Sequence, residues 1–264
     1  MEKHKTEVRL AAIGDIHCTK TAQGTLQSVF AQAATAADVL LLAGDLTAYG
    51  QPEEAQTLAR ELTAAAKIPI VAVLGNHEYE SGREADVQQI LTDIGVTLLD
   101  GSACEVLGVG FAGVKGFGGG FNERALEPWG ESTMKRFVQE AVEETLKLGS
   151  ALARLRTPHR VALVHYAPIL ATVEGEPREI FPFLGSSRLE EPIDRYRATA
   201  VFHGHAHHGR PEGRTRGDVP VFNVAMSLLQ RTYPNRPPFR LFTIPTPAPE
   251  PDVAGSASRV FNQP

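Results

Sequence analysis

Residues 8–17 read VRLAAIGDIH, an apolar run that ends in a glycine, an aspartate and, two positions later, a histidine. The run is short, is apolar except for Arg9 and closes at a glycine, which predicts a buried strand. Four further runs have the same form: 39–45 (VLLLAGD), 68–76 (IPIVAVLGN), 160–165 (RVALVH) and 199–205 (TAVFHGH). All five end in a residue type that can coordinate metal ions.

Helical patterns separate these runs, at 24–37, 52–67, 83–94 and 131–155. Strands that alternate with helices predict a layered α/β fold. Short strands and glycines fill 97–123, and two more strand-like runs, VPVFNVA and FRLFTI, follow residue 219 with no helical pattern between them. We therefore expect a second sheet that is more antiparallel than the first.

The chain is expected to form one domain over residues 1–244. Its 264 residues, 42% of them hydrophobic, can bury a large single core. From Pro245 onward the sequence is rich in proline, alanine and serine and lacks an apolar face, which predicts an extended or disordered tail over 245–264. The glycine-rich stretch 116–121 is interpreted as a mobile loop rather than a phosphate cradle.

Charge and cysteine content exclude several classes of protein. The formal charge is 26 − 31 = −5, with scattered basic residues, which disfavours nucleic acid as a partner. No apolar run is long enough to predict a membrane span. Cys18 and Cys104 lie far apart without a CxxC spacing, so we expect neither a disulfide scaffold nor a thiolate site, and a cytoplasmic location. Cys18 is interpreted as a packing residue.

The strand-end residues are expected to converge, because ligands bind in open α/β sheets outside the carboxyl ends of the strands. Asp15 and His17 are two positions apart, so an extended backbone would point both side chains the same way. His205 and His207 in GHAH repeat this spacing, while His203 should lie in the strand and His208 should point away.

Each strand-end residue has an ordinary structural explanation when it is taken singly. Asp15, Asp45 and Asn76 fit turn or helix-cap positions, and His165 fits a hydrogen-bonded core histidine. Five consecutive strand ends that carry D-x-H, GD, GNH, H and GHxH are hard to explain this way. Together they predict a metal site.

The motifs GDIH, GDLT, GNHE, VHYAP and GHAH, in this order, resemble those of the calcineurin-like metallophosphoesterase superfamily over about residues 8–225. The resemblance implies a four-layer α/β/β/α sandwich of two mixed β-sheets flanked by helices. It also implies two divalent or trivalent metal ions bridged by Asp45. The ligands would be Asp15, His17, Asp45 and His207 for one ion, and Asp45, Asn76, His165 and His205 for the other.

The resemblance also implies the chemistry. Carboxylates and imidazoles without thiolates suit manganese, iron or zinc. Two such ions would activate a bridging hydroxide for attack on a phosphoester. His77 would donate a hydrogen bond or proton to the leaving oxygen; the alternative is that it only orients its neighbours.

The second motif departs from that of the phosphoprotein phosphatases, which read GDxxDRG. Here Ala48 and Tyr49 replace the Asp-Arg pair. This favours the cyclic-nucleotide phosphodiesterase-like (class III) branch and a small phosphodiester substrate. The alternatives are a phosphomonoesterase, protein phosphatase or nuclease of the same superfamily, or a scaffold that binds metal without catalysis.

Overall fold

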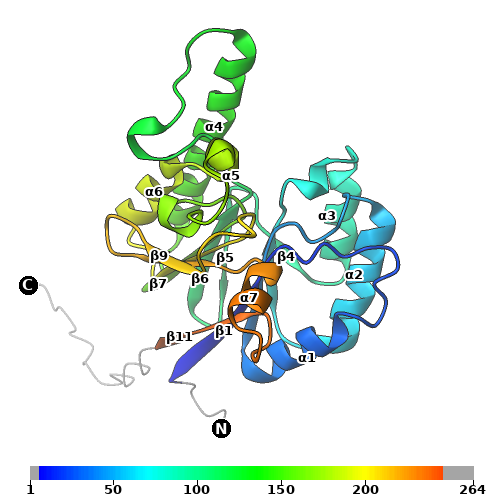
Figure 1. Cartoon of the computed structure of the whole chain (residues 1–264). Helices are drawn as coiled ribbons and strands as arrows, with labels where there is room; N and C mark the ends of the chain where they lie inside the picture. Colours follow the sequence, from blue (N-terminus) through cyan, green and yellow to red (C-terminus); the bar gives the residue numbers. More distant parts are fainter. Residues whose placement is uncertain (1–5, 246–264) are drawn as a thin grey trace, which may run out of the picture.

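Two β-sheets face each other in the computed structural model, which describes residues 6–245 (Figure 1). The first sheet has the order β11-β1-β2-β3-β4 and the second the order β5-β6-β7-β8-β10-β9. The strands of the first sheet are β1 (Glu7–Ile13), β2 (Val39–Ala43), β3 (Ile70–Val73), β4 (Thr97–Leu98) and β11 (Arg240–Pro245). Those of the second are β5 (Ser102–Val106), β6 (Val109–Val114), β7 (His159–Val164), β8 (Ala200–His203), β9 (Glu212–Arg214) and β10 (Pro220–Asn223).

Side chains that alternate along the strands divide the core into layers. In β1, Leu10 and Ala12 face the second sheet, where they pack with Phe111 and Phe202, whereas Ala11 and Ile13 face the helices. Successive strand residues point to opposite faces, so a strand that is apolar at every position can bury both of them. The uninterrupted apolar runs of the sequence are explained by this arrangement.

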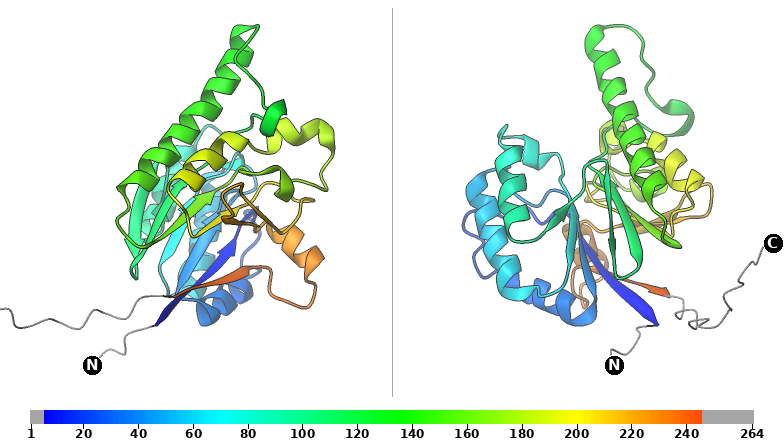
Figure 2. Two further views of the ribbon diagram at one scale, coloured as in Figure 1. Left: turned by 90° about the vertical axis from the view of Figure 1, so that its left-hand side faces the viewer. Right: turned by 180° about the vertical axis from the view of Figure 1, so that it is seen from behind.

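Helices cover the outer face of each sheet (Figure 2). The helices are α1 (Gln27–Ala36), α2 (Pro52–Ala65), α3 (Glu84–Asp93), α4 (Ser132–Arg154), α5 (Phe181–Leu184), α6 (Glu190–Arg195) and α7 (Met226–Thr232). Residues of α1, α2 and α3 pack on the first sheet, and residues of α4 and α6 pack on the second. The predicted four-layer α/β/β/α sandwich is therefore confirmed.

The direction of the strands brings their carboxyl ends to a common edge. Strands β1, β2 and β3 are mutually parallel, and so are β6, β7, β8 and β10. Within residues 6–245 the second sheet is more antiparallel than the first, as predicted, because two of its five strand pairs (β5 with β6 and β9 with β10) are antiparallel, against one of four (β1 with β11) in the first. The antiparallel pairs lie at the sheet edges, so the centre of the second sheet is parallel. The expectation of no helix after residue 219 is wrong, since α7 lies between β10 and β11.

The glycine-rich stretch 116–121 is a loop that packs closely against the segment 182–185. Gly119 N–H donates to the Pro182 carbonyl (2.6 Å) and Gly120 N–H to the Gly185 carbonyl (2.9 Å). A Cβ at Gly118 would lie 2.6 Å from the Pro182 oxygen. The glycines are therefore explained by close contact between two backbone segments, which a sequence pattern does not reveal.

The predicted tail lies outside the described residues, except for Pro245, which ends β11 and pairs with Glu7. No helix within residues 6–245 is long and apolar enough to cross a bilayer.

The buried Glu61 side chain of α2 fastens the segment that precedes α1. Its carboxylate accepts hydrogen bonds from Gly24 N–H (2.7 Å), Leu26 N–H (3.0 Å) and the Gln27 amide (3.3 Å). Burial alone would raise the pKa of Glu61, but these donors outweigh it and lower the pKa below its ordinary value of 4.5. The ionised side chain therefore stabilises the fold.

Glu61→Gln is expected to lower the free energy of unfolding at pH 7 by roughly 1–3 kcal/mol, since the N–H groups lose a charged acceptor. A lowered folded-state pKa gives stability that is present above the ordinary value of 4.5 and lost as the pH falls through the folded value. Urea denaturation of both proteins should therefore show a difference that shrinks below that pH. Glu53→Gln, at an exposed position of the same helix, is the control and should show no such difference.

Candidate metal centre

The seven predicted ligand side chains lie together at the common edge of the two sheets. They form two groups that share Asp45. One contains Asp15, His17, Asp45 and His207, and the other contains Asp45, His165 and His205, with potential ligand atoms within 4.8 Å of one another in each group. Asn76 adjoins the second group, because its Oδ1 lies 3.0 Å from His165 Nε2. We call these the first and second donor groups.

The backbone conformation at these positions differs from the one predicted. Strand β1 ends at Ile13, and Asp15 (φ 53°) and His17 (φ 46°) both have left-handed backbones, as do Asp45 (φ 48°) and His205 (φ 70°). The expected extended D-x-H geometry is therefore wrong, although the two side chains do share one donor group. Non-glycine residues rarely adopt this region, and strained backbones of this kind cluster at functional sites.

Glycines at the strand ends allow these segments to approach one another. A Cβ on Gly75 would lie 2.1 Å from Asp45 Oδ1, and one on Gly44 would lie 2.5 Å from His165 Nδ1. A Cβ on Gly204 would lie 2.2 Å from Asp15 Oδ2. Each glycine thus leaves space for a potential ligand from another strand, which explains why glycine precedes the donor residue in these motifs.

Backbone carbonyls orient two histidines of the second group. His165 Nδ1 lies 2.9 Å from the Ala43 carbonyl oxygen, and His205 Nε2 lies 3.1 Å from the Phe183 oxygen. A carbonyl oxygen can only accept, so these nitrogens carry the hydrogens. His165 Nε2 and His205 Nδ1 remain as the nitrogens that can bind a metal ion. Metal-binding histidines are commonly oriented in this way.

Buried carboxylates make the centre attractive to cations. Burial would lower the pKa of His165, but Asp45, 3.2 Å away, raises it to about 9. Burial would raise the pKa of Asp45, but His165 and the His77 N–H bring it below its ordinary value. The hydrogen bond from His207 Nε2 to Asp15 (2.8 Å) raises the pKa of His207.

Burial lowers the pKa of the two remaining histidines. The pKa of His17 falls below its ordinary value, and that of His205 falls to about 4, with the charge of nearby His165 adding to the effect of burial. His17 and His205 are therefore neutral near pH 7. A neutral imidazole is the form that binds metal ions.

His77 lies beside the donor groups. Its backbone N–H donates to Asp45 Oδ1 (3.0 Å), and its Nδ1 lies 2.6 Å from the Ala48 carbonyl oxygen. The ring is therefore fixed with Nε2 directed toward Asp45, 3.8 Å from Oδ2. His77 begins the short 3₁₀ helix His77–Tyr79 that follows Asn76.

Glu78 is a positioning residue that the sequence prediction missed. It is fully buried, and its Oε1 accepts from both N–H (2.8 Å) and Oγ1 (2.7 Å) of Thr47. Its Oε2 accepts from Gly75 N–H (2.7 Å). One carboxylate thus ties the loop after Asp45 to the loop that carries Asn76. The glutamate of GNHE was the available signal.

The remaining histidines of VFHGHAHHGR lie outside both groups. His203 ends β8, is buried, and contacts Thr172 Oγ1 (2.8 Å) and the Gly204 carbonyl (2.8 Å); burial lowers its pKa to about 4. The backbone N–H of His208 donates to Glu176 (2.6 Å).

Cys18 is buried, and burial raises the pKa of its thiol to about 12, which agrees with a packing role.

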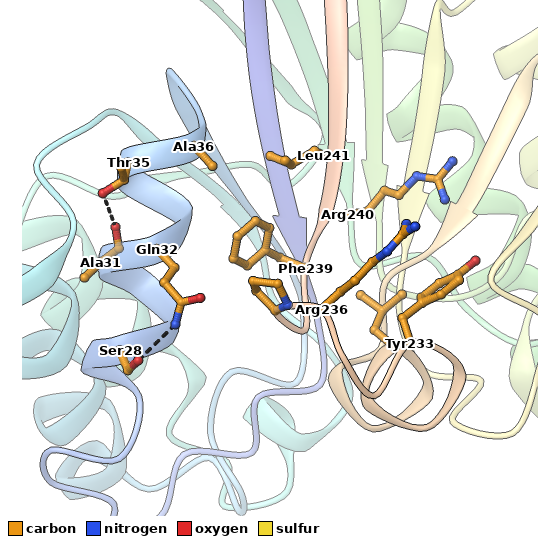
Figure 3. A pocket seen from close by; sticks show the side chains of 12 residues that line it. Ser28, Ala31, Gln32, Thr35, Ala36, Tyr233, Arg236, Phe239, Arg240 and Leu241 are labelled. Atoms are coloured by element: carbon orange, nitrogen blue, oxygen red, sulfur yellow. Dashed lines mark hydrogen bonds between the residues drawn. The ribbon is translucent and has the colours of Figure 1, made fainter.

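Two of the surface cavities among residues 6–245 differ in their position relative to the donor groups. One of about 740 Å³ lies between α1 and residues 233–241, and no donor residue lines it (Figure 3). Another of about 630 Å³ is lined by segments that follow β6, β7 and β8 at the same edge as the donor groups, including Arg124, Arg178 and Arg210. Pro182 also lines it, next to Phe183, whose carbonyl contacts His205. The second cavity has the size of a small-molecule site.

Gly75→Ala is expected to weaken manganese binding by about 10- to 100-fold, the usual effect of disturbing groups that position metal ligands. The added Cβ must displace the Asp45 side chain and also its backbone nitrogen, which would lie 2.3 Å away. Calorimetric titration of the metal-free protein with Mn²⁺ measures the change in manganese affinity.

Gly149→Ala is the matched control, since its Cβ would meet only Pro192 at an ordinary 3.5 Å within α4. It should leave manganese affinity unchanged. Equal affinity in the Gly75→Ala and wild-type proteins would contradict the close-approach explanation.

Comparisons with known proteins agree with this architecture. A family model described as calcineurin-like phosphoesterase matches residues 8–209. A search of curated proteins finds no match. The fold is similar to the phosphopantetheinyl hydrolase PptH from Mycobacterium tuberculosis (TM-score 0.66, 17% identity, 95% of this chain and 99% of that one). It is also similar to a protein assigned as a 5′-nucleotidase from Staphylococcus aureus (TM-score 0.50, 16% identity, 83% of this chain and 48% of that one).

Identities this low show a shared fold alone, whereas the family match covers most of the chain. The chain belongs to the calcineurin-like phosphoesterase family.

Proposed function

We propose that the protein is a binuclear metal-dependent phosphodiesterase that hydrolyses a small phosphodiester. Family membership supports the coarser statement that it is a phosphoric ester hydrolase. The observation that carries the proposal is the sharing of Asp45 by two donor groups, because a carboxylate can bridge two cations.

The donor set fits two metal ions. Asp15, His17, Asp45 and His207 would hold one ion, and Asp45, Asn76, His165 and His205 the other. Carboxylate, amide and imidazole ligands without a thiolate suit manganese, iron or zinc. The carbonyl-fixed rings of His165 and His205 support this assignment, since each has one nitrogen left to face the second group.

The metal ions would supply Lewis-acid chemistry, activating water near neutral pH and neutralising charge on the phosphoryl oxygens. The contribution of the chain is positional. Asp45 belongs to both groups, and Glu78 ties the loop after Asp45 to the loop that carries Asn76. His77, whose Nε2 faces the centre while Nδ1 donates to Ala48, is the proposed donor to the leaving oxygen.

A diester is favoured over a monoester because the chain lacks the arginine of the GDxxDRG motif. Tyr49 stands in place of that arginine, and its side chain, which is 62% exposed, carries no guanidinium. Its neighbour Ala48 offers only its backbone carbonyl, which accepts a hydrogen bond from His77. A monoester dianion carries one more negative charge than a diester, so the missing guanidinium disfavours the monoester more strongly. The neighbours named for phosphopantetheinyl and 5′-nucleotide substrates share only the fold and do not decide between these classes.

Hydrolysis of bis-p-nitrophenyl phosphate by the manganese-loaded protein is expected to exceed hydrolysis of p-nitrophenyl phosphate by at least about tenfold in kcat/KM, a difference of roughly 1.4 kcal/mol in transition-state binding. Release of nitrophenolate measures both reactions. Activity on the monoester alone would reject the diesterase and favour a phosphomonoesterase.

Asp45→Ala is expected to abolish hydrolysis and to lower the metal content, because the substitution removes the carboxylate shared by both groups. His77→Asn is expected to retain the metal and to lose about 10²–10⁴-fold in kcat, the usual contribution of general acid–base catalysis. Elemental analysis and steady-state kinetics on the same preparations separate the two effects.

Asp93→Ala, at an exposed position of α3, is the control and should match wild type in both measurements. Unchanged metal content in Asp45→Ala would refute the bridging role. Loss of metal from His77→Asn would mean that His77 orients ligands instead of donating to the substrate.

A further inference from the structure

The lysine that follows β6 occupies the same edge as the donor groups. Strand β6 runs parallel to β7, so their carboxyl ends are adjacent. Lys115 is the first residue after β6, and its carbonyl accepts hydrogen bonds from the backbone N–H groups of His165 (2.9 Å) and Tyr166 (3.1 Å). Just as the neighbouring strand ends present potential ligands, the end of β6 presents an ammonium group.

Aromatic rings surround this ammonium. Lys115 Nζ lies 5.5 Å from the ring centroid of Tyr79, 4.9 Å from that of Phe117 and 5.4 Å from that of Tyr166. Two of these rings adjoin the candidate centre. The Tyr166 ring lies 4.4 Å from that of His205, and Tyr79 is two residues from His77. The Tyr166 ring therefore links the ammonium to His205 of the second donor group.

The charge of Lys115 is only partly compensated within the protein. Among residues 6–245 its ammonium donates to the Gly116 carbonyl (2.8 Å) and forms no ion pair. The nearby Glu144 carboxylate is engaged by Gly116 N–H (2.7 Å) and Lys147 (2.8 Å). Burial lowers the pKa of Lys115, and the charges of Glu144, Glu140 and Asp100 partly offset this effect. A partly buried ammonium without a paired carboxylate is costly, which points to a role beyond packing.

We propose that Lys115 is a substrate-binding residue whose ammonium donates a hydrogen bond to an anionic phosphoryl oxygen of the ester held beside the second donor group. An ammonium has three donors, and Gly116 takes one of them. This inference rests on the proposed phosphoesterase function. The site would thus have one ammonium from the second sheet in place of the missing arginine, which matches the single negative charge of a phosphodiester.

The surrounding rings indicate the chemical class of the ester substituent. A row of aromatic contacts runs from Phe117 to Phe137 (4.9 Å between centroids) and on to Phe183 (6.0 Å). Tyr79 and Phe183 are 41% and 57% exposed. Exposed rings beside an anion-binding group suit a planar or apolar substituent. The substrate is therefore inferred to be an anionic phosphoester with such a substituent.

Lys115→Met tests the inference through the binding of inorganic phosphate to the manganese-loaded protein, measured by isothermal titration calorimetry. Loss of one charge-assisted hydrogen bond is expected to weaken phosphate binding by about tenfold or more. Metal content should stay at the wild-type level. KM for bis-p-nitrophenyl phosphate should rise, and Lys115→Arg should restore much of the phosphate affinity because it keeps the charge. Lys135→Met, exposed on α4, is the control.

Phosphate affinity within twofold of wild type in Lys115→Met would overturn the inference. A parallel fall in metal content or in the free energy of unfolding, with no rescue by arginine, would also overturn it, because Lys115 would then be structural. A wild-type protein that hydrolyses neither nitrophenyl ester but binds phosphate in a Lys115-dependent way would reject the proposed function and retain the binding site.

Discussion

The arrangement at the strand ends depends on one contact between the two sheets, that of Asp45 with His165. Asp45 follows β2 of the first sheet and His165 follows β7 of the second, and their side chains lie 3.2 Å apart. Both are almost fully buried, so the carboxylate and imidazole interact in surroundings of low dielectric constant. The interaction joins the two halves of the sandwich at the point where both donor groups meet.

Four residues of the donor groups have unfavourable backbone conformations, which the rest of the fold stabilises. Asp15, His17, Asp45 and His205 have positive φ, and such residues persist only where the surrounding structure fixes them. Hydrogen bonds fix the surrounding segments: the Ala43 carbonyl accepts from His165, and the Glu78 carboxylate accepts from Thr47 and Gly75. The layered apolar core behind the strand ends makes these positions rigid, and a preorganised site gains its precision from this rigidity.

The two sheets contribute different chemistry to the edge they share. The first sheet supplies the acidic and amide side chains Asp15, Asp45 and Asn76, together with His17 and His77. The second supplies His165, the GHAH histidines and the ammonium of Lys115. On the proposed function, a phosphoester lying between the sheets would meet metal ions held by ligands from both sheets and an ammonium from the second.

The amino-acid sequence by itself determined the layered α/β fold and the residues that stand at the strand ends, and its motifs implied the sandwich through the family they resemble. Runs such as VLLLAGD predict both the burial of a strand and the residue at its carboxyl end, and their alternation with helical patterns predicts the layers. Only the tertiary structure decided the left-handed backbone at Asp15 and His17, the parallel centre of the second sheet, the helix α7, and the packing of 116–121. The physical reason is that these features depend on contacts between distant segments. The carbonyl that orients His165 lies 122 residues away in the chain, and the rings around Lys115 come from three separate loops, so no local pattern encodes them.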